Sequence, residues 1–179
     1  MPLNVSGMPI AIPDSEAPPT VALPVPYATQ NPYLNLCWAA CGQMVFGYHH
    51  INVTMCTLAS KVFNQDCCTD LTVCDQPAWP YQVYDVCQVT YKSVGGPMSA
   101  NSVSDWIRSL YPIQIYFQWT GGGAHTALIV GFFDDGDLLI YDPKWGSARQ
   151  SYDFVLKGYG MGSWQETWYD METSGGPLA

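Results

Sequence analysis

A loop that leads into a predicted helix reads Gln30-Asn31-Pro32-Tyr33-Leu34-Asn35-Leu36-Cys37-Trp38-Ala39-Ala40-Cys41. Asn35 is a good N-cap, and helical spacing continues from Leu36 to about Tyr48. Apolar residues surround most of this helix, so we expect it to be buried on several sides. Cys37 falls in the first turn, where unpaired amides and the helix macrodipole stabilise a thiolate. The pattern therefore predicts a reactive thiol at the start of a buried helix, with Cys41 one turn further into the core.

The rest of the chain divides into a helical first half and a β-rich second half. Further helices are predicted over Met55–Phe63, Pro80–Cys87 and Ala100–Leu110, the last with Ser99 as its N-cap. After Tyr111, branched and aromatic residues predict strands at Ile113–Phe117, Thr126–Phe133, Asp137–Tyr141, Arg149–Phe154 and Ser163–Tyr169. A tight turn at Asp134–Asp137 would join the second and third strands as a hairpin. We therefore predict an α+β domain in which a helical N-terminal half packs on an antiparallel C-terminal sheet.

The charge of the chain is acidic, and its basic residues are scattered. Of 179 residues, 48% are hydrophobic and 12% are charged, and the net charge is −9. The six Lys and Arg residues occur singly, so the sequence lacks the basic stripe that neutralises nucleic-acid phosphates. No stretch approaches the ~18 apolar residues of a membrane span. We therefore expect no nucleic acid among the partners and no membrane span.

Proline sets the N-terminal segment apart from the rest of the chain. Residues 1–26 hold seven prolines, and proline removes backbone donors and favours extended chain. We expect an arm or linker there, outside the core, followed by one domain over residues 27–170 and a tail over residues 171–179. The N-terminus has neither a basic n-region nor an apolar h-region, so we expect no classical secretion signal in this chain.

Seven cysteines are many for a cytosolic protein of this size. An odd number is typical of one reactive thiol plus up to three disulfides, which points to an oxidising compartment. The adjacent Cys67 and Cys68 are expected to take different partners. Zinc binding by Cys56, Cys67, Cys68, Cys74 and Cys87 is one alternative, although no C-x-x-C pair occurs and no histidine is interleaved, and plain buried thiols are another. Sequence does not choose among the fifteen pairings of the six cysteines other than Cys37, which are Cys41, Cys56, Cys67, Cys68, Cys74 and Cys87.

A thiol nucleophile needs a histidine as its base, and the chain has three. His49 and His50 lie near the end of the helix that carries Cys37, about three turns away, so they are poorly placed to reach it. His125 remains. It opens an apolar strand and follows the glycines at 121–123, whose missing side chains would leave room for a bound chain. We therefore predict His125 as the base.

An acid should accept a hydrogen bond from the histidine and fix its tautomer. Asp142 ends the apolar run Leu138–Tyr141, whereas the earlier aspartates are explained by the turn. If Phe133 pairs with Leu138, His125 and Asp142 project from the same face of the sheet, and Trp145 would shield their hydrogen bond. The alternative for Asp142 is a simple strand-ending Asp-Pro turn.

A side-chain amide beside the thiol would stabilise the oxyanion that forms when the thiolate attacks a carbonyl. Gln30 stands seven residues before Cys37. Together with the backbone N–H of Cys37, its amide would stabilise the oxyanion of a tetrahedral intermediate. A glutamine in a loop carries no such meaning by itself, so this prediction depends on that spacing.

In these features the chain resembles the papain-like cysteine peptidases of the bacterial avirulence-effector type. The resemblance runs from about Val25 to Tyr169. Its histidine context, Ala124-His125-Thr126, departs slightly from the commonest one in the family. The resemblance rests on Val25-Pro26, Gln30, Cys37-Trp38-Ala39-Ala40, Cys56, Cys67-Cys68, Cys74, Trp119-Thr120-Gly121-Gly122-Gly123-Ala124-His125, Tyr141-Asp142-Pro143 and Trp164.

The resemblance implies a papain-like fold with a catalytic cleft between its two halves, and functional positions at Gln30, Cys37, His125 and Asp142. The implied activity is hydrolysis of peptide bonds through a Cys-His-Asp triad and a thioester, with neither a metal nor a cofactor. The same thiol chemistry would serve deamidation or transpeptidation, because the acceptor is not encoded in the triad. An inactive, disulfide-stabilised binding module is a third alternative.

A catalytic domain behind a Pro-rich arm is typical of a secreted or delivered bacterial effector or toxin, and a secreted digestive peptidase is the alternative. We expect this protein to act outside the producing cell. Its expected partners are a protein or peptide substrate and a cognate inhibitor or immunity protein.

Overall fold

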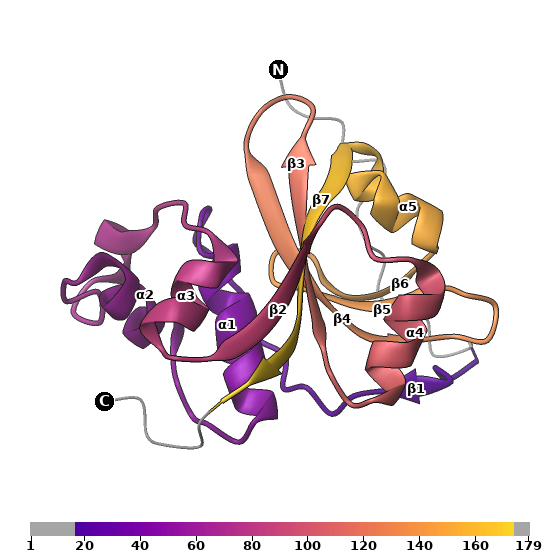
Figure 1. Cartoon of the computed structure of the whole chain (residues 1–179). Coiled ribbons are helices and arrows are strands. Elements are labelled where there is room, and N and C mark those ends of the chain that lie inside the picture. Colours follow the sequence, from indigo (N-terminus) through magenta and orange to yellow (C-terminus); the bar gives the residue numbers. More distant parts are fainter. Residues whose placement is uncertain (1–16, 174–179) are drawn as a thin grey trace.

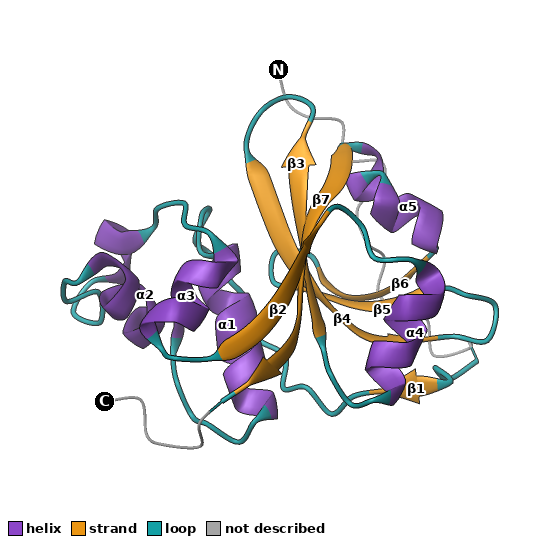
Figure 2. Ribbon diagram, viewed as in Figure 1, coloured by secondary structure: helices purple, strands orange, loops and turns teal. Residues whose placement is uncertain are grey.

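The computed structural model describes residues 17–173. In Figure 1 the first three helices gather beside one end of a twisted sheet, and the later helices α4 and α5 lie on the other side of it. Figure 2 shows the same division, with helices at one side and strands at the centre. The predicted α+β architecture is confirmed. No helix between residues 17 and 173 is long and apolar enough to cross a membrane.

Most helices precede the main run of strands, and α5 falls between β6 and β7. The helices are α1 (Cys37–Tyr48), α2 (Met55–Phe63), α3 (Pro80–Val86), α4 (Ala100–Arg108) and α5 (Tyr152–Leu156), with 3₁₀ turns η1 (Leu71–Cys74) and η2 (Gly158–Gly160). The strands are β1 (Val21–Ala22), β2 (Thr90–Gly95), β3 (Ile113–Trp119), β4 (Ala124–Phe132), β5 (Leu138–Asp142), β6 (Gly146–Gln150) and β7 (Gly162–Glu172). They form one antiparallel sheet in the order β2-β7-β3-β4-β5-β6, with β1 paired to β4.

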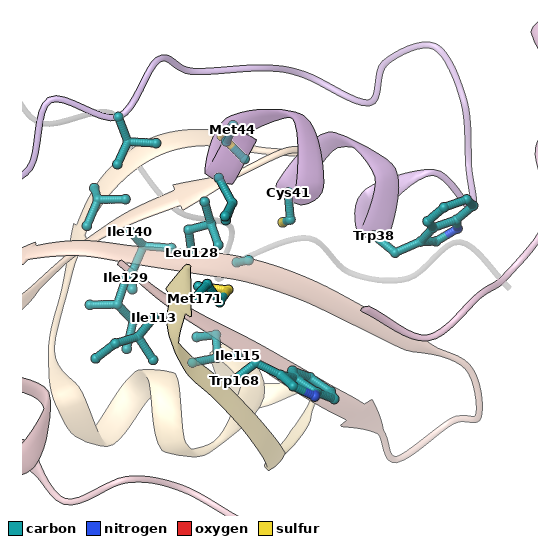
Figure 3. Packing of buried hydrophobic residues seen from close by; sticks show 14 of the residues in the cluster. Trp38, Cys41, Met44, Ile113, Ile115, Leu128, Ile129, Ile140, Trp168 and Met171 are labelled. Atoms are coloured by element: carbon teal, nitrogen blue, oxygen red, sulfur yellow. The ribbon is translucent and has the colours of Figure 1, made fainter. Parts of the chain in front are cut away.

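Helix α1 is the centre of the helical half, because its apolar surface packs against α2, α3 and β4. Figure 3 shows Cys41 and Met44 pointing from α1 toward the sheet residues around Leu128. Both side chains are fully buried, and the Cys41 thiol donates to the carbonyl oxygen of Thr126 at 3.5 Å. The prediction that α1 is buried on several sides, with Cys41 in the core, is therefore confirmed.

Two predicted helix caps differ in outcome. Ser99 caps α4 as expected, since its hydroxyl accepts from the backbone N–H of Ser102 at 3.2 Å. The prediction for Asn35 is wrong: Leu36 is the N-cap of α1, and no side chain caps it. The Asn35 side chain instead donates to the backbone carbonyl of Asp75 at 2.9 Å. A tertiary hydrogen bond thus replaces the local cap, and it leaves the amides at the start of α1 without a side-chain partner.

The strand predictions fail in two places. The expected strand Arg149–Phe154 is wrong, because β6 ends at Gln150 and Ser151 caps a new helix, its hydroxyl accepting from Phe154 N at 3.3 Å. Strand β2 was missed. It is an edge strand paired only to β7, and most of its side chains are exposed. Its sequence therefore has no buried face whose apolar pattern would reveal it.

The N-terminal segment differs from the arm that its prolines predicted. The described part, residues 17–26, packs on the domain: Leu23 and Val25 are buried, and β1 pairs with the end of β4. Glycine makes this close approach feasible, since a Cβ at Gly131 would lie 2.4 Å from the carbonyl oxygen of Val21. The prolines thus flank a short strand that pairs with the end of β4, just beyond the β4 residues that pair with the start of β3. Residues 1–16 of the expected arm lie outside the described residues, as does the C-terminal end of the expected tail.

Two disulfides close the loop between α2 and α3. They join Cys56 to Cys68 and Cys67 to Cys74, so the adjacent Cys67 and Cys68 take different partners as predicted. Cys37, Cys41 and Cys87 are not bridged. Zinc binding by these cysteines is not supported, because Cys56, Cys67, Cys68 and Cys74 are all paired in disulfides.

Candidate active site

Cys37 and His125 line one cavity between the helical half and the sheet. Cys37 is the first residue of α1 and is half-buried, and His125 is the second residue of β4 and is 6% exposed. The cavity measures about 430 Å³. Besides these two, its lining is Leu34, Asn35, Trp38, Pro77, Ala78, Trp79, Pro80, Gln82, Tyr116, Gln118, Trp119, Gly123, Ala124 and Thr126. Both halves of the domain contribute, so the expected cleft between them is present.

The imidazole of His125 lies between an acid and the thiol. Its Nε2 is 2.9 Å from both carboxylate oxygens of Asp142. Cys37 lines the same cavity, and its side chain contributes to raising the pKa of His125. Since Nε2 is taken by Asp142, Nδ1 is the nitrogen that remains for the thiol. The sequence prediction that these three residues come together is therefore met by the geometry.

Asp142 is held by more than the histidine. It is fully buried, and its Oδ1 accepts from the backbone amides of Lys144 at 2.8 Å and Trp145 at 3.1 Å. Its Oδ2 accepts from the hydroxyl of Tyr159 at 3.2 Å. A buried carboxylate requires such donors, since its charge has lost water. The turn after β5 is thus part of the site, and the Asp-Pro turn that was the alternative explanation exists alongside the bond to His125.

The register of the hairpin differs from the prediction by one residue. Phe133 was expected to pair with Leu138, and this is wrong: Phe132 pairs with Leu138, because Phe133 instead closes the turn with its N–H bonded to Asp137 O at 2.8 Å. Side chains alternate between faces along a strand. If the observed register continued unchanged, Asp142 would therefore lie on the opposite face from His125.

A bulge in β4 corrects this offset. The pairing of β4 with β5 shifts by one residue between Ile129 and Gly131. One extra residue in one strand reverses which face every later side chain takes. Beyond the bulge, Asp142 and His125 share a face, which allows the 2.9 Å contacts between them. The extra residue in β4 is therefore a requirement of the site.

The electrostatics favour a protonated imidazole. Burial by itself lowers the pKa of His125, because the imidazolium loses hydration, but the charge and hydrogen bond of Asp142 and the contact with Cys37 act the other way. Together they raise the pKa of His125 from its ordinary 6.5 to about 10. Cys41 behaves differently, since burial raises the pKa of its thiol well above the usual value. The two neighbouring thiols therefore differ: Cys37 lies beside the protonated imidazole of His125, whereas Cys41 stays un-ionised in the core.

Aromatic rings enclose the histidine. Trp119 stacks on His125 with ring centroids 5.8 Å apart, and Trp145 lies tilted at 5.0 Å on another side. Tyr159 meets Trp145 edge-on at 5.8 Å. These rings exclude water from the bond between His125 and Asp142, which strengthens it. The expected shielding by Trp145 is observed, and Trp119 also lines the cavity.

Gln30 is buried close to the turn that follows β5, but its side chain does not line the cavity. Its Nε2 donates to the carbonyl oxygens of Tyr33 at 3.1 Å and Leu34 at 3.2 Å, and its Oε1 has no partner among the described residues. Its backbone N–H donates to Pro143 O at 2.8 Å, which fixes the loop against the turn after β5. The structure brings together Cys37, His125 and Asp142, while the Gln30 amide bonds within its own loop.

Sequence reasoning missed two residues that position the site. Tyr159 donates to Asp142 from a backbone with φ of 57°, a conformation that the sequence gave no reason to expect at this tyrosine. Asp75 accepts from the backbone amides of Leu34 at 3.0 Å and Asn35 at 2.7 Å, directly before α1. Asp75 lies some 40 positions beyond the loop that it holds, so no local pattern connects the two.

A family model described as the papain-like cysteine protease AvrRpt2 matches residues 19–159. The chain belongs to this family. It is a cysteine protease with the papain-like fold, and its family implies a protein or peptide substrate. Among curated proteins, none matches the chain.

Solved structures of bacterial peptidases share the fold of this protease at low sequence identity. The peptidase domain of the Streptococcus ABC transporter ComA is 13% identical over 77% of this chain and 91% of that one, with a TM-score of 0.58. A putative C39-like peptidase from Bacillus anthracis is 14% identical over 88% of this chain and 100% of that one, with a TM-score of 0.59. A double-glycine-motif protease of an AMS/PCAT transporter, solved with a leader peptide, is 16% identical over 89% of this chain and 100% of that one, with a TM-score of 0.58.

Proposed function

We propose that this protease hydrolyses peptide bonds with Cys37 as nucleophile, His125 as general acid and base, and Asp142 as the residue that orients His125. The observation that carries the proposal is the position of His125, which bonds Asp142 through Nε2 at 2.9 Å and contacts Cys37 inside the cavity. This order of groups keeps one imidazole nitrogen for the thiol.

The proposed reaction has two halves. The Cys37 thiolate attacks the carbonyl carbon, and the resulting oxyanion collapses to a thioester as the C–N bond breaks and His125 gives its proton to the leaving amine. Water then attacks the thioester and gives a proton to His125. The acid product leaves, and the thiolate is restored beside a protonated imidazole. No cofactor enters the scheme.

Two donors are proposed for the oxyanion, one at the start of α1 and one in the loop before it. The backbone N–H of Cys37 is proposed as one, supported by the absence of a side-chain cap on this helix. Gln30 is proposed as the second donor. In that role its amide leaves the carbonyl oxygens of Tyr33 and Leu34 when the substrate binds. Replacing Gln30 by alanine and by glutamate tests the assignment. Either change removes the amide donor, so kcat for peptide cleavage should fall in both variants.

Alkylation tests the thiol assignment. Brief treatment with limiting iodoacetamide at mildly acidic pH should label Cys37 ahead of the buried Cys41 and Cys87, and His125→Ala should slow the labelling of Cys37. Labelling of Cys37 no faster than of Cys41 or Cys87 would contradict the proposal. Mass spectrometry of products then identifies the reaction: hydrolysis yields two shorter peptides, whereas deamidation leaves the chain uncut and transpeptidation joins new ends.

We also propose that the protease is secreted or delivered and acts as an effector or toxin on a target protein outside the producing cell. Support comes from its family and from its two disulfides, which persist in oxidising surroundings. A cognate inhibitor or immunity protein is the proposed regulatory partner. Immunoblots of culture medium, producing cells and exposed target cells test the location, and detection only inside the producing cells would contradict it.

A further inference from the structure

A second cavity lies beside the candidate active site and shares a wall with it. We call it the Glu166 cavity; it measures about 380 Å³ and is lined by Trp79, Tyr81, Tyr91, Ser93, Glu166 and Trp168. Trp79, the residue before α3, lines both cavities. In Figure 1 the elements that carry these residues, α3, β2 and β7, lie next to one another at the edge of the sheet. A chain leaving the cleft over Trp79 would therefore meet this cavity.

Aromatic rings form a continuous band from one cavity to the other. Trp79 stacks on Tyr116 with centroids 4.7 Å apart and on Tyr81 at 6.2 Å, and Tyr116 meets Trp168 edge-on at 6.3 Å. Trp79 and Tyr81 remain 42% and 38% exposed. Exposed aromatic faces grouped around a hollow are typical of a binding site, because burying them against a ligand is favourable.

Glu166 gives the second cavity its charge. It pairs across the sheet with Tyr116, which in turn pairs with Thr126 in the wall of the active-site cavity. Tyr116 lines the active-site cavity and pairs with Glu166, so it lies between the two sites. Burial raises the pKa of Tyr116, and the charges of Cys37 and Glu166 add to this effect. Within residues 17–173 no ion pair is formed by the carboxylate of Glu166.

The two cavities differ in the side chains that they suit. Apart from Cys37 and His125, the active-site cavity is lined by uncharged residues. The Glu166 cavity combines four aromatic rings with a carboxylate, and ring faces and carboxylates both attract cations. A second acid, Asp85, accepts from the hydroxyl of Tyr91 at 3.0 Å and adds negative charge at its margin.

We propose that the Glu166 cavity binds a lysine or arginine side chain of the polypeptide substrate, as a subsite that extends the active-site cleft past Trp79. The proposal rests on the proposed peptide-bond hydrolysis, since it assigns the cavity to the same substrate. The apolar part of the side chain would lie between the rings and its charged end against Glu166. Substrates would then be selected for a basic residue at a fixed distance from the cleaved bond, while the residues beside that bond are uncharged.

A binding experiment tests the cavity without catalysis. The Cys37→Ala variant is titrated with N-acetyl-lysine amide and with N-acetyl-norleucine amide, which has no charge, while the indole N–H signals of Trp79 and Trp168 are followed by NMR. We expect the lysine compound to shift both signals and the norleucine compound to have little effect. Glu166→Gln in the same background should abolish the difference. Equal shifts with both compounds, or no shift with either, would overturn the proposal.

A cleavage experiment tests the subsite. A peptide library is digested by the wild type, by Glu166→Gln and by Glu172→Gln, which removes the same charge from the same strand outside the cavity. We expect a preference for Lys and Arg at one position, with kcat/KM for those peptides reduced about tenfold by Glu166→Gln and unchanged by Glu172→Gln. Cleavage without such a preference would overturn the subsite. An absence of any cleavage would instead contradict the proposed hydrolysis, and the titration would still decide whether the cavity binds cations.

Discussion

Both carboxylate oxygens of Asp142 lie 2.9 Å from Nε2 of His125, although the two residues come from different strands whose pairing would separate them without a bulge. The contact fixes which imidazole nitrogen faces the thiol. It also offsets the cost of burying a charged imidazole. The chemistry of the site thus depends on one extra residue in β4.

Replacing Asp142 by asparagine should leave burial as the main influence on His125. Its pKa should then fall from about 10, because the charge and the hydrogen bond of Asp142 are lost while burial still lowers the pKa. We expect kcat/KM to fall by roughly 10²- to 10⁴-fold. NMR titration of the His125 ring and peptide cleavage measure the two effects. Asp153→Asn, an exposed change on α5, serves as the control and should alter neither.

Tyr159→Phe removes only the hydroxyl that bonds Asp142. The ring would keep its contacts with Phe117 at 4.8 Å and Phe154 at 5.7 Å, so the fold should persist. The loss of one hydrogen bond to a buried carboxylate should cost about 1–3 kcal/mol of unfolding free energy. Asp142 keeps two backbone donors, so activity should fall less than in Asp142→Asn. Chemical denaturation and the pH profile of kcat/KM test this, and a loss as large as that of Asp142→Asn would contradict it.

The stability of the fold should depend on pH through His125. Its folded pKa of about 10 lies above the ordinary 6.5, so its contribution is complete below pH 6.5 and is lost as the pH rises through 10. Urea unfolding at a series of pH values across this window measures the loss. The double variant His125→Gln/Asp142→Asn removes the pair together and should show a smaller decline over the same range. An identical decline in both proteins would show that other groups are responsible.

Asp75 should control the geometry of the loop before Cys37. Asp75→Ala leaves the amides of Leu34 and Asn35 without their carboxylate, so we expect a loss of about 1–3 kcal/mol in stability. Cys37 should also react more slowly with iodoacetamide, because the start of α1 is less firmly held. Asp105→Asn, an exposed change on α4, is the matched control. Unchanged stability and thiol reactivity in Asp75→Ala would contradict the assigned role.

Local signals in the sequence were sufficient for the parts of the site that depend on one element each. Cys37 begins α1 because an apolar helical pattern begins there, and Asp142 ends β5 because an apolar run ends there. The α+β division was likewise visible as a change of periodicity after Tyr111. These features depend on residues that are close together in the sequence, so a local sequence pattern predicts them.

What depends on distant residues was not predictable in this way. The Asn35 side chain turns away from its cap position because Asp75 offers a tertiary partner. The bulge in β4 has no signature that distinguishes it from a continuous strand, so the register was off by one. Strand β2 carries no apolar face, and β1 is a strand only because Gly131 admits it. In each case the outcome is decided by a contact between segments rather than by the segment itself.

The disulfide between Cys67 and Cys74 ends one residue before Asp75, while the unbridged thiol of Cys37 begins the helix that Asp75 helps to hold. The Cys37 thiol must therefore stay reduced, while the disulfide between Cys67 and Cys74 must stay oxidised. A mild reductant protects Cys37 from oxidation, but a stronger one opens the loop that supports it. Activity should consequently pass through a maximum as the concentration of thiol reductant in the assay rises. The protease would then be active only within a limited range of redox potential, with an upper and a lower bound.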